Sequence, residues 1–274
     1  DYDISFVAQT DFPVPIPTDG FGTLAGIAPS SKIVGLKVLD DLGMGTKVAV
    51  LNAFDWCIAN KTALNITVIN LSLGFETIEQ DMDDAIEVLV RTEGIVVVAA
   101  AGNNGKLSTK IGSPGSAPHA ITVGAVNRLN EVTDYSSIGS SKYNNKVVKP
   151  DVTAPGGSYL EYPFTSSPIP NEIYACDSNF DDIAQDSNED FFWVDNKTTQ
   201  DKYKDDYTPM VGTSMATPHV SGIAQLLIQR LAANNGGNWT WSGANALKVK
   251  QLLSMSTSES AALGIGGEYL QNHT

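Results

Sequence analysis

Cysteine, basic residues and long apolar runs are all scarce in this chain of 274 residues. The two cysteines, Cys57 and Cys176, are too few for a disulfide framework, and nothing in the sequence says whether they pair. There are 17 basic residues against 31 acidic ones, and the net charge of −14 argues against nucleic acid or an anionic membrane as a partner. No apolar run reaches the ~18 residues needed to cross a bilayer. Residues 1–10 lack the pattern of a signal peptide, so any export signal is expected outside this sequence.

The composition is that of a packed globular protein, with 42% hydrophobic and 18% charged residues. A chain of this length is sufficient for one large α/β domain. Strand-like and helix-like stretches alternate along it, which predicts parallel strands with helices covering the sheet. Cys57 falls in the first expected helix, where a buried apolar role is expected. The expected strands are 32–39, 67–73, 95–101 and 120–126, and the expected helices are 46–59 and 78–92.

The most informative stretch is GTSMATPHVSG, residues 212–222, because it places Ser214 where a helix begins. Apolar residues at helical spacing follow the serine, and Pro218 is expected in the first turn, where its missing N–H costs little. A serine at a helix start sits among unpaired backbone donors that favour a nearby oxyanion. The alternative is an ordinary serine N-cap, which needs no catalysis.

This stretch resembles the nucleophile motif of the subtilisin-like serine proteases. Further segments fall in that family's order and at roughly its spacing: GIAPSSKIVGLKVLD (26–40), NLSLG (70–74), VVVAAAGNNG (96–105) and KPDVTAPGG (149–157). The resemblance implies a three-layer α/β fold with a central, mostly parallel sheet flanked by helices. It also implies a serine endopeptidase that acts on protein or peptide substrates.

The resemblance implies two catalytic residues, the nucleophile Ser214 and the oxyanion donor Asn103. It also implies that an extended peptide pairs with the strand ends that line the cleft. The competing interpretation of Asn103 is a turn residue, because Asn and Gly dominate turns. The substrate-binding residues are expected to be Ser72, Leu73, Gly74, Ala100, Ala101, Gly102 and Thr213.

A histidine base and an orienting acid, which the family places before the serine, are not evident. His273 is near the end of the sequence, His119 precedes a strand where the family has no base, and His219 points about 140° away from Ser214 on the same helix. GFGTLAG (20–26), with Phe21, looks like the family's histidine box, but we reject that alignment because it runs directly into GIAPSSKI. The candidate acids Asp1, Asp3 and Asp11 lack the expected apolar lead-in.

We therefore expect residues 1–274 to be a partial subtilase catalytic domain, its C-terminal two-thirds, with an acidic insertion at about 158–208. The histidine and the aspartate are expected upstream of this chain, and the chain alone is expected to be inactive. No cofactor or metal is expected to take part in catalysis. Structural calcium is one interpretation of Asp177, Asn179 and Asp181, and a solvated loop is the other.

Two other functions compete with an active endopeptidase. One is a catalytically inactive homologue that serves as a binding or structural protein, and the other is a serine hydrolase acting on small esters. A lipase-like elbow would read G-x-S-x-G, whereas residue 216 is alanine. Six N-x-S/T sequons, at Asn60, Asn65, Asn70, Asn196, Asn238 and Asn272, weakly support export. We expect a secreted or cell-surface monomer.

Overall fold

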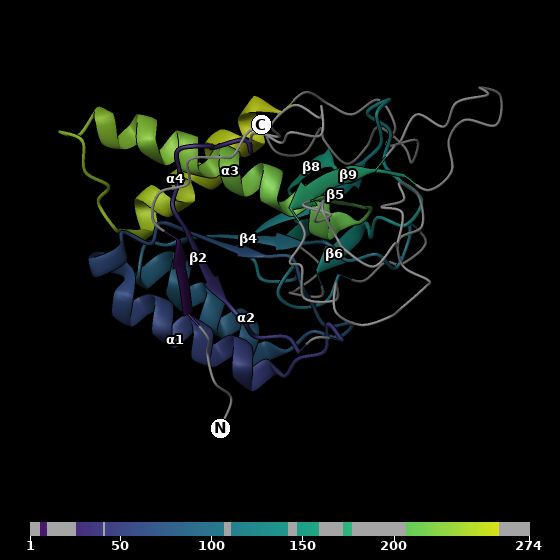
Figure 1. The fold of residues 1–274 in the computed structure, drawn as a ribbon, viewed down its shortest axis with the longest axis horizontal. Helices are drawn as coiled ribbons and strands as arrows, with labels where there is room; N and C mark the ends of the chain where they lie inside the picture. The colour runs from purple at the N-terminus through teal and green to yellow at the C-terminus, as the bar shows by residue number, and fades with distance from the viewer. Residues whose placement is uncertain are drawn as a thin grey trace, which may run out of the picture.

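The computed structural model describes residues 6–9, 26–40, 42–106, 111–141, 147–158, 172–176 and 207–257 (Figure 1). Its centre is a four-stranded parallel sheet in the order β3-β4-β5-β8. These strands are Val68–Leu71, Val96–Ala100, Ile121–Val126 and Val152–Pro155. Three short antiparallel pairs lie outside this sheet: β1 (Phe6–Gln9) with β2 (Ile33–Leu36), β6 (Gly139–Ser141) with β7 (Val147–Lys149), and β9 (Ile173–Cys176) with β10 (Tyr207–Met210).

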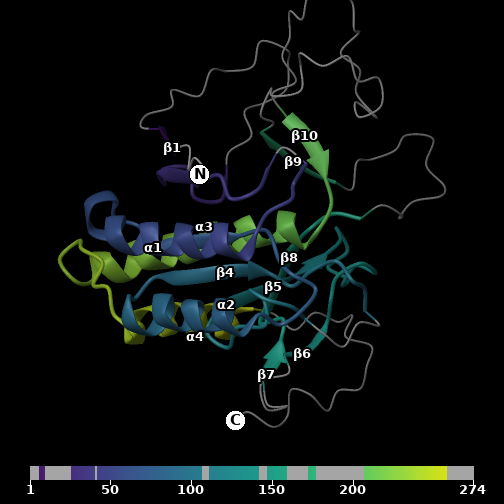
Figure 2. The same cartoon turned by 90° about the horizontal axis from the view of Figure 1, so that it is seen from below.

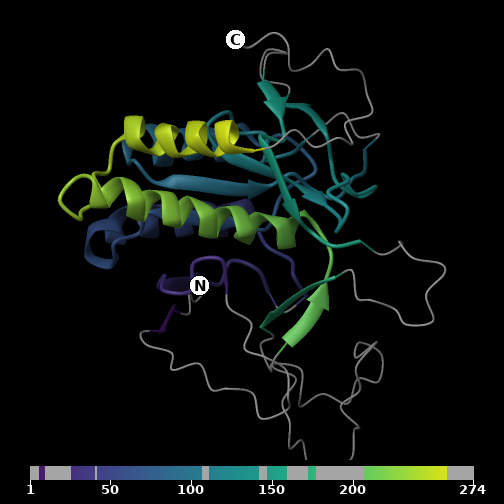
Figure 3. The ribbon, with the colours of Figure 1, turned by 90° about the horizontal axis from the view of Figure 1, so that it is seen from above.

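Helices cover both faces of the sheet, which is therefore the middle layer of a three-layer fold. α3 (Thr213–Ala233) crosses one face and contacts all four strands. α2 (Gln80–Glu87) and α4 (Gly243–Ser256) lie on the other face, as Figures 2 and 3 show with the sheet seen edge-on. α1 (Lys47–Leu64) contacts α2. The predicted α/β architecture is therefore confirmed.

Burial follows from this layering. Every residue of β4 and β5 is buried, as expected for β-branched and alanine runs covered on both faces. α1 begins after Thr46, whose hydroxyl accepts a hydrogen bond from the Ala49 N–H, and it ends at Asn65 in a left-handed conformation. Cys57 is a free thiol in the hydrophobic core, which confirms its predicted apolar role.

Two elements differ from the sequence prediction. The expected helix over 78–92 is α2 followed by a π-helical turn, Val88–Thr92, in which the Glu93 N–H donates to the Val88 carbonyl. The expected strand over 32–39 is the shorter β2, which pairs with antiparallel β1 and is not part of the parallel sheet. One edge of β2 pairs with β1, from Phe6 opposite Leu36 to Gln9 opposite Ile33.

A buried ion cluster links the start of β5 to the start of β8. The Lys149 ammonium donates to the Ala120 carbonyl, the Thr122 hydroxyl and the Asp151 carboxylate, each at 2.8 Å. Lys250, from α4, reaches the other oxygen of Asp151 at 2.9 Å. Burial lowers the pKa of Lys149 to about 7. Burial opposes ionisation of Asp151, but the two lysines outweigh it and lower the pKa of this carboxyl.

Most of the predicted acidic insertion lies outside the described residues. This includes Asp177, Asn179 and Asp181, and the segment 20–25 with Phe21 lies outside them too. The candidate acids Asp1, Asp3 and Asp11 also belong to the parts of the chain that the structure does not describe.

Candidate active site

Ser214 is the second residue of α3, and the N-cap residue is Gly212, which has no side chain to cap the helix. Gly212 has a φ of 152°, a conformation that side chains disfavour. A Cβ atom at Gly212 would also lie 3.4 Å from the Asn103 Nδ2. The serine is therefore not the N-cap that the simpler interpretation requires. Because Gly212 has no side chain, Asn103 can lie close to the start of the helix.

Pro218 is inside α3 and not in its first turn, so that prediction is wrong. The helix begins at Thr213, which makes proline its sixth residue. In a regular α-helix the N–H of residue 218 donates a hydrogen bond to the carbonyl of Ser214. Proline has no N–H, so this hydrogen bond is missing from α3.

Asn103 follows β4 and caps α3 from another part of the chain. Its Oδ1 accepts hydrogen bonds from the Thr213 N–H and the Thr213 hydroxyl, both at 3.0 Å. The Thr213 Oγ1 in turn accepts from the Gly102 N–H at 3.1 Å. A backbone N–H can only donate, so these contacts require the amide oxygen to face Thr213. The Nδ2 donor group is thereby turned away from Thr213 and toward Gly212.

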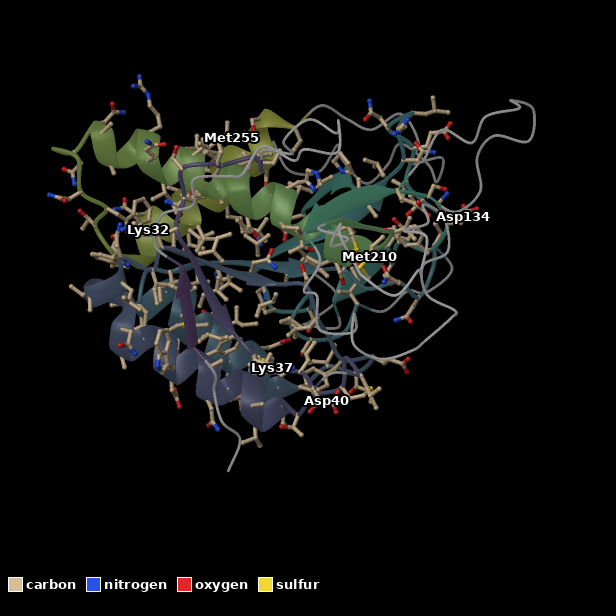
Figure 4. The ribbon with its side chains drawn as sticks, in the orientation of Figure 1. Lys32, Lys37, Asp40, Asp134, Met210 and Met255 are labelled. Carbon is tan, nitrogen blue, oxygen red and sulfur yellow. The ribbon has the colours of Figure 1, made fainter. Side chains whose placement is uncertain are left out.

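A second loop braces the segment that carries Asn103. The Asn104 N–H donates to the Ser137 hydroxyl at 3.0 Å, and the Ser137 N–H donates to the Gly102 carbonyl at 2.9 Å. Lys106 forms an ion pair with Asp134 and, through that hydrogen bond, lowers the pKa of the Asp134 carboxyl. Figure 4 shows Asp134 on the side of the molecule toward which the strands run, together with Met210 just before α3. The strand ends and the helix start therefore meet there.

Ser72, directly after β3, is joined to Ser214 by two reciprocal hydrogen bonds. The Ser214 hydroxyl donates to the Ser72 carbonyl at 3.1 Å, and the Ser72 hydroxyl donates to the Ser214 carbonyl at 2.8 Å. Both residues are partly buried. The nucleophile candidate is thus fixed against the end of β3.

Close backbone packing holds α3 against β8. The Gly212 N–H donates to the Gly156 carbonyl at 2.8 Å. A Cβ atom at Gly156 would lie 2.5 Å from the Ala125 Cβ and 2.7 Å from the Gly212 carbonyl oxygen. The lack of a side chain at Gly156 therefore allows the start of α3 to approach the end of β8 closely. No sequence pattern predicts this role of Gly156, although the residue lies in the KPDVTAPGG segment.

The structure brings together four of the predicted site residues, Ser72, Asn103, Thr213 and Ser214, through direct hydrogen bonds. Thr213 is fully buried and bonded to Asn103, so its side chain is not exposed as a substrate-binding residue would be. Leu73 and Gly74 continue from Ser72, while Ala100 and Ala101 are buried and lead to the partly exposed Gly102.

The arrangement can stabilise a negative charge next to the Ser214 hydroxyl. Within the described segments, the Ser214 N–H has no hydrogen-bond partner, and it lies at the positive end of a helix of 21 residues. Asn103 is exposed and has its amide donor directed toward the same helix start. Two donor groups, the Asn103 amide and the Ser214 N–H, therefore lie near the start of the helix that carries the Ser214 hydroxyl.

Neither histidine in the described residues can act as the base for Ser214. His219 Nδ1 lies 2.8 Å from the Met215 carbonyl, on its own helix. His119 contacts Glu87 and precedes β5, so it lies at the amino end of the sheet, whereas Ser214 lies at the carboxyl ends of the strands. His273 is outside the part of the chain that the structure describes.

Within the described ranges, no three side chains of the metal-binding types gather closely enough to hold a metal ion. The helices described there are all too short or too polar to span a membrane.

Residues 12–269 match the Subtilase family, Peptidase_S8. The chain is 33% identical to Subtilisin NAT of Bacillus subtilis subsp. natto over 207 residues, which are 75% of this chain and 41% of that protein. It is 32% identical to the serine protease AprX of Bacillus subtilis over 225 residues, 76% of this chain and 45% of the relative. Among solved structures, a cold adapted subtilisin-like serine proteinase matches with a TM-score of 0.58 and 25% identity, covering 87% of this chain and 65% of the other. The chain thus spans about half the length of the curated relatives it matches.

Proposed function

The chain belongs to the subtilase family of peptidases, and from this premise we propose that it carries the nucleophile of a serine endopeptidase. Ser214 attacks the carbonyl carbon of a peptide bond, and the Asn103 Nδ2 and the Ser214 N–H donate to the oxyanion that forms. The observation that carries the proposal is the double hydrogen bond from Thr213 to the Asn103 Oδ1. It fixes the donor before substrate binds, and preorganised donors are effective because they need no reorganisation as charge develops.

The proton of Ser214 must be transferred to a base during the attack. In the described state the hydroxyl donates to the Ser72 carbonyl, so it has to turn from this acceptor to an imidazole. We propose that the histidine and its orienting aspartate are supplied from outside this sequence. The histidine takes the hydroxyl proton as the C–O bond forms and returns it to the leaving amine as the C–N bond breaks. Water then hydrolyses the acyl-enzyme by the same steps in reverse order.

We propose that the substrate is an extended peptide held between the segments Ser72–Gly74 and Ala100–Gly102. Both segments continue from adjacent parallel strands, β3 and β4, at the edge where ligands bind in open α/β sheets. The small residues there leave room for a bulky side chain before the cleaved bond. Main-chain pairing accounts for affinity, and side-chain pockets account for specificity.

The test is covalent labelling with a fluorophosphonate, followed by a peptide-hydrolysis assay. We expect the natural full-length protein to be labelled at Ser214 and to hydrolyse peptides, and a Ser214→Ala variant to lose both properties. The chain of 274 residues alone is expected to show no appreciable turnover, because we propose that its histidine base lies outside this sequence. Turnover by this chain close to that of an intact protease would contradict the incomplete-triad proposal.

A catalytically inactive homologue that binds other proteins is the alternative, and the absence of a base within reach of Ser214 in the described residues favours it. In that case the full-length protein would neither label nor turn over substrate. The retained Asn103 and Ser214 favour the enzyme, since a binding protein requires neither.

Structural calcium, export from the cell and a monomeric state are further properties that we propose for this protein. If Asp177, Asn179 and Asp181 bind structural calcium, a chelator should lower the unfolding temperature, and Asp181→Ala should remove most of that sensitivity. Equal melting with and without chelator would leave the solvated-loop interpretation. We also propose a secreted or cell-surface location, which the N-x-S/T sequons weakly support, and fractionation of the native host would test it.

A further inference from the structure

Pro218 changes the hydrogen bonding of the helix turn that carries Ser214. In an α-helix the N–H of residue 218 donates to the carbonyl of residue 214, and proline has no N–H. Pro218 is inside α3, so the Ser214 carbonyl loses its regular α-helical donor. A carbonyl oxygen left without that donor in a partly buried position destabilises the turn unless another group bonds to it.

The Ser72 hydroxyl supplies a donor at this point. It lies 2.8 Å from the Ser214 carbonyl oxygen, although the two residues are 142 positions apart in the sequence. The Ser214 hydroxyl donates back to the Ser72 carbonyl at 3.1 Å. The main chain and the side chain of the nucleophile are therefore both held by one residue of the strand end.

Asn70 directs the Ser72 proton toward Ser214. The Asn70 Nδ2 donates to the Ser72 Oγ at 3.0 Å, so the single hydroxyl proton of Ser72 is left to donate to the Ser214 carbonyl. Asn70 also accepts a hydrogen bond from the Ser221 hydroxyl at 2.8 Å. Ser221 lies two turns further along α3, so the end of β3 is linked to the helix at two levels.

We propose that Ser72 is a positioning residue for Ser214, whose hydroxyl replaces the N–H that Pro218 lacks. This role rests on the proposed function and is distinct from the main-chain pairing of Ser72 with substrate. It fixes the first turn of α3, and with it the Ser214 N–H and Oγ, relative to the Asn103 amide. Because Pro218 cannot donate to the Ser214 carbonyl, this carbonyl is bonded by Ser72, and the start of α3 is thereby linked to the end of β3.

The test is a double-mutant cycle of Ser72→Ala and Pro218→Ala in the natural full-length protein. With Pro218 present, Ser72→Ala should lower kcat by roughly three- to tenfold with KM little changed, as expected for one hydrogen bond. In the Pro218→Ala background the new N–H can donate to the Ser214 carbonyl, so the same substitution should lower kcat less than twofold. Ser72→Thr, which keeps the hydroxyl, should recover most of the loss. Ser256→Ala, which removes a hydroxyl that bonds to Leu253 in α4, is the control.

The same cycle measured by urea unfolding does not depend on activity. Ser72→Ala should lower the unfolding midpoint more in the parent protein than in the Pro218→Ala background. An equal effect of Ser72→Ala in both backgrounds would overturn the proposal, and so would an unchanged kcat when Pro218 is present. If Ser72→Ala does not fold, the Ser72→Ala, Pro218→Ala double variant should fold, and its failure would also count against the proposal. An inactive parent protein would refute the proposed function and the positioning role, while the unfolding cycle would still decide whether Ser72 replaces the missing N–H.

Discussion

Thr213 holds Asn103 through two hydrogen bonds to one oxygen, from its N–H and from its hydroxyl, each 3.0 Å long. The sequence offers an oxyanion donor and a turn residue as interpretations of Asn103, and the structure adds a third role, a cap for α3. The Asn103 Oδ1 caps α3 in place of the side chain that Gly212 lacks, and its Nδ2 is left to donate elsewhere. A loss of Asn103 should accordingly affect both stability and the proposed catalysis.

Asn103→Ala is expected to reduce kcat by roughly 10²- to 10³-fold, about 2.7–4 kcal/mol, with KM little changed; this range is the known one for the corresponding asparagine of a subtilisin. The amide meets the oxygen fully only when it has become tetrahedral and charged, so ground-state binding hardly senses its removal. Loss of the cap should also lower the free energy of unfolding by about 1 kcal/mol. Steady-state kinetics corrected by fluorophosphonate titration of active sites measure the first effect.

The matched control for that substitution is Asn104→Ala, at the next residue, which is also exposed. Its backbone N–H, which bonds to Ser137, is retained in the variant. We expect kcat within about twofold of the parent value, since a surface substitution rarely exceeds ±0.5 kcal/mol. If Asn103→Ala behaves like Asn104→Ala, the oxyanion role of Asn103 is wrong.

Gly156→Ala should lower both stability and kcat. The added methyl group would overlap the Ala125 Cβ and the Gly212 carbonyl, so the helix start has to move outward. Overpacking of this kind costs about 1–3 kcal/mol in unfolding free energy. Gly35→Ala in β2 is the control, because a Cβ atom there meets nothing within 4 Å. Urea unfolding and active-site-corrected kinetics measure the two effects, and equal behaviour of the variants would contradict the packing argument.

Lys149 should make stability depend on pH above neutrality. Burial lowers its pKa in the folded protein to about 7, below its ordinary value of 10.5. Between these values the unfolded chain holds a proton that the folded protein has released, so the free energy of unfolding rises with pH in that window. The expected contribution is up to about 1.4 kcal/mol per pH unit. Urea unfolding between about pH 7.5 and about pH 9.5, values within that window, measures it.

Lys149→Met should remove this contribution, because the substituted side chain does not titrate. The exposed Lys248 provides the control, and Lys248→Met should keep the pH dependence of the parent protein. If the parent protein and Lys149→Met change equally over the window, Lys149 keeps its proton in the folded state.

Cys57 should be unreactive in the native protein. Burial raises the pKa of its thiol to about 11, and the side chain is 6% exposed, so thiolate is both scarce and inaccessible. In a Cys176→Ser variant, which leaves Cys57 as the single thiol, iodoacetamide at about pH 8 should label the protein only after unfolding. Mass spectrometry of intact protein detects the adduct, and rapid native labelling would mean that α1 opens readily.

The sequence by itself determined the buried central strands, and it predicted the pair Ser214 and Asn103. Uninterrupted β-branched and alanine residues predicted β4 and β5 as covered strands, and the ordered motifs predicted Ser214 and Asn103 as partners. The strand predictions succeeded because a strand buried on both faces requires apolar residues throughout, while the catalytic roles of Ser214 and Asn103 stay predictions.

Only the tertiary structure decided how those residues are held. Pro218 reads as a residue of the first turn until the start of α3 is known, and nothing local reveals that Ser72, 142 positions away, bonds to the Ser214 carbonyl. The cap that Asn103 provides spans 110 positions. Such contacts depend on how the sheet and α3 pack, at distances fixed by Gly156 and Gly212 together. Sequence periodicity records which face of an element is buried, but packing determines which atoms meet there.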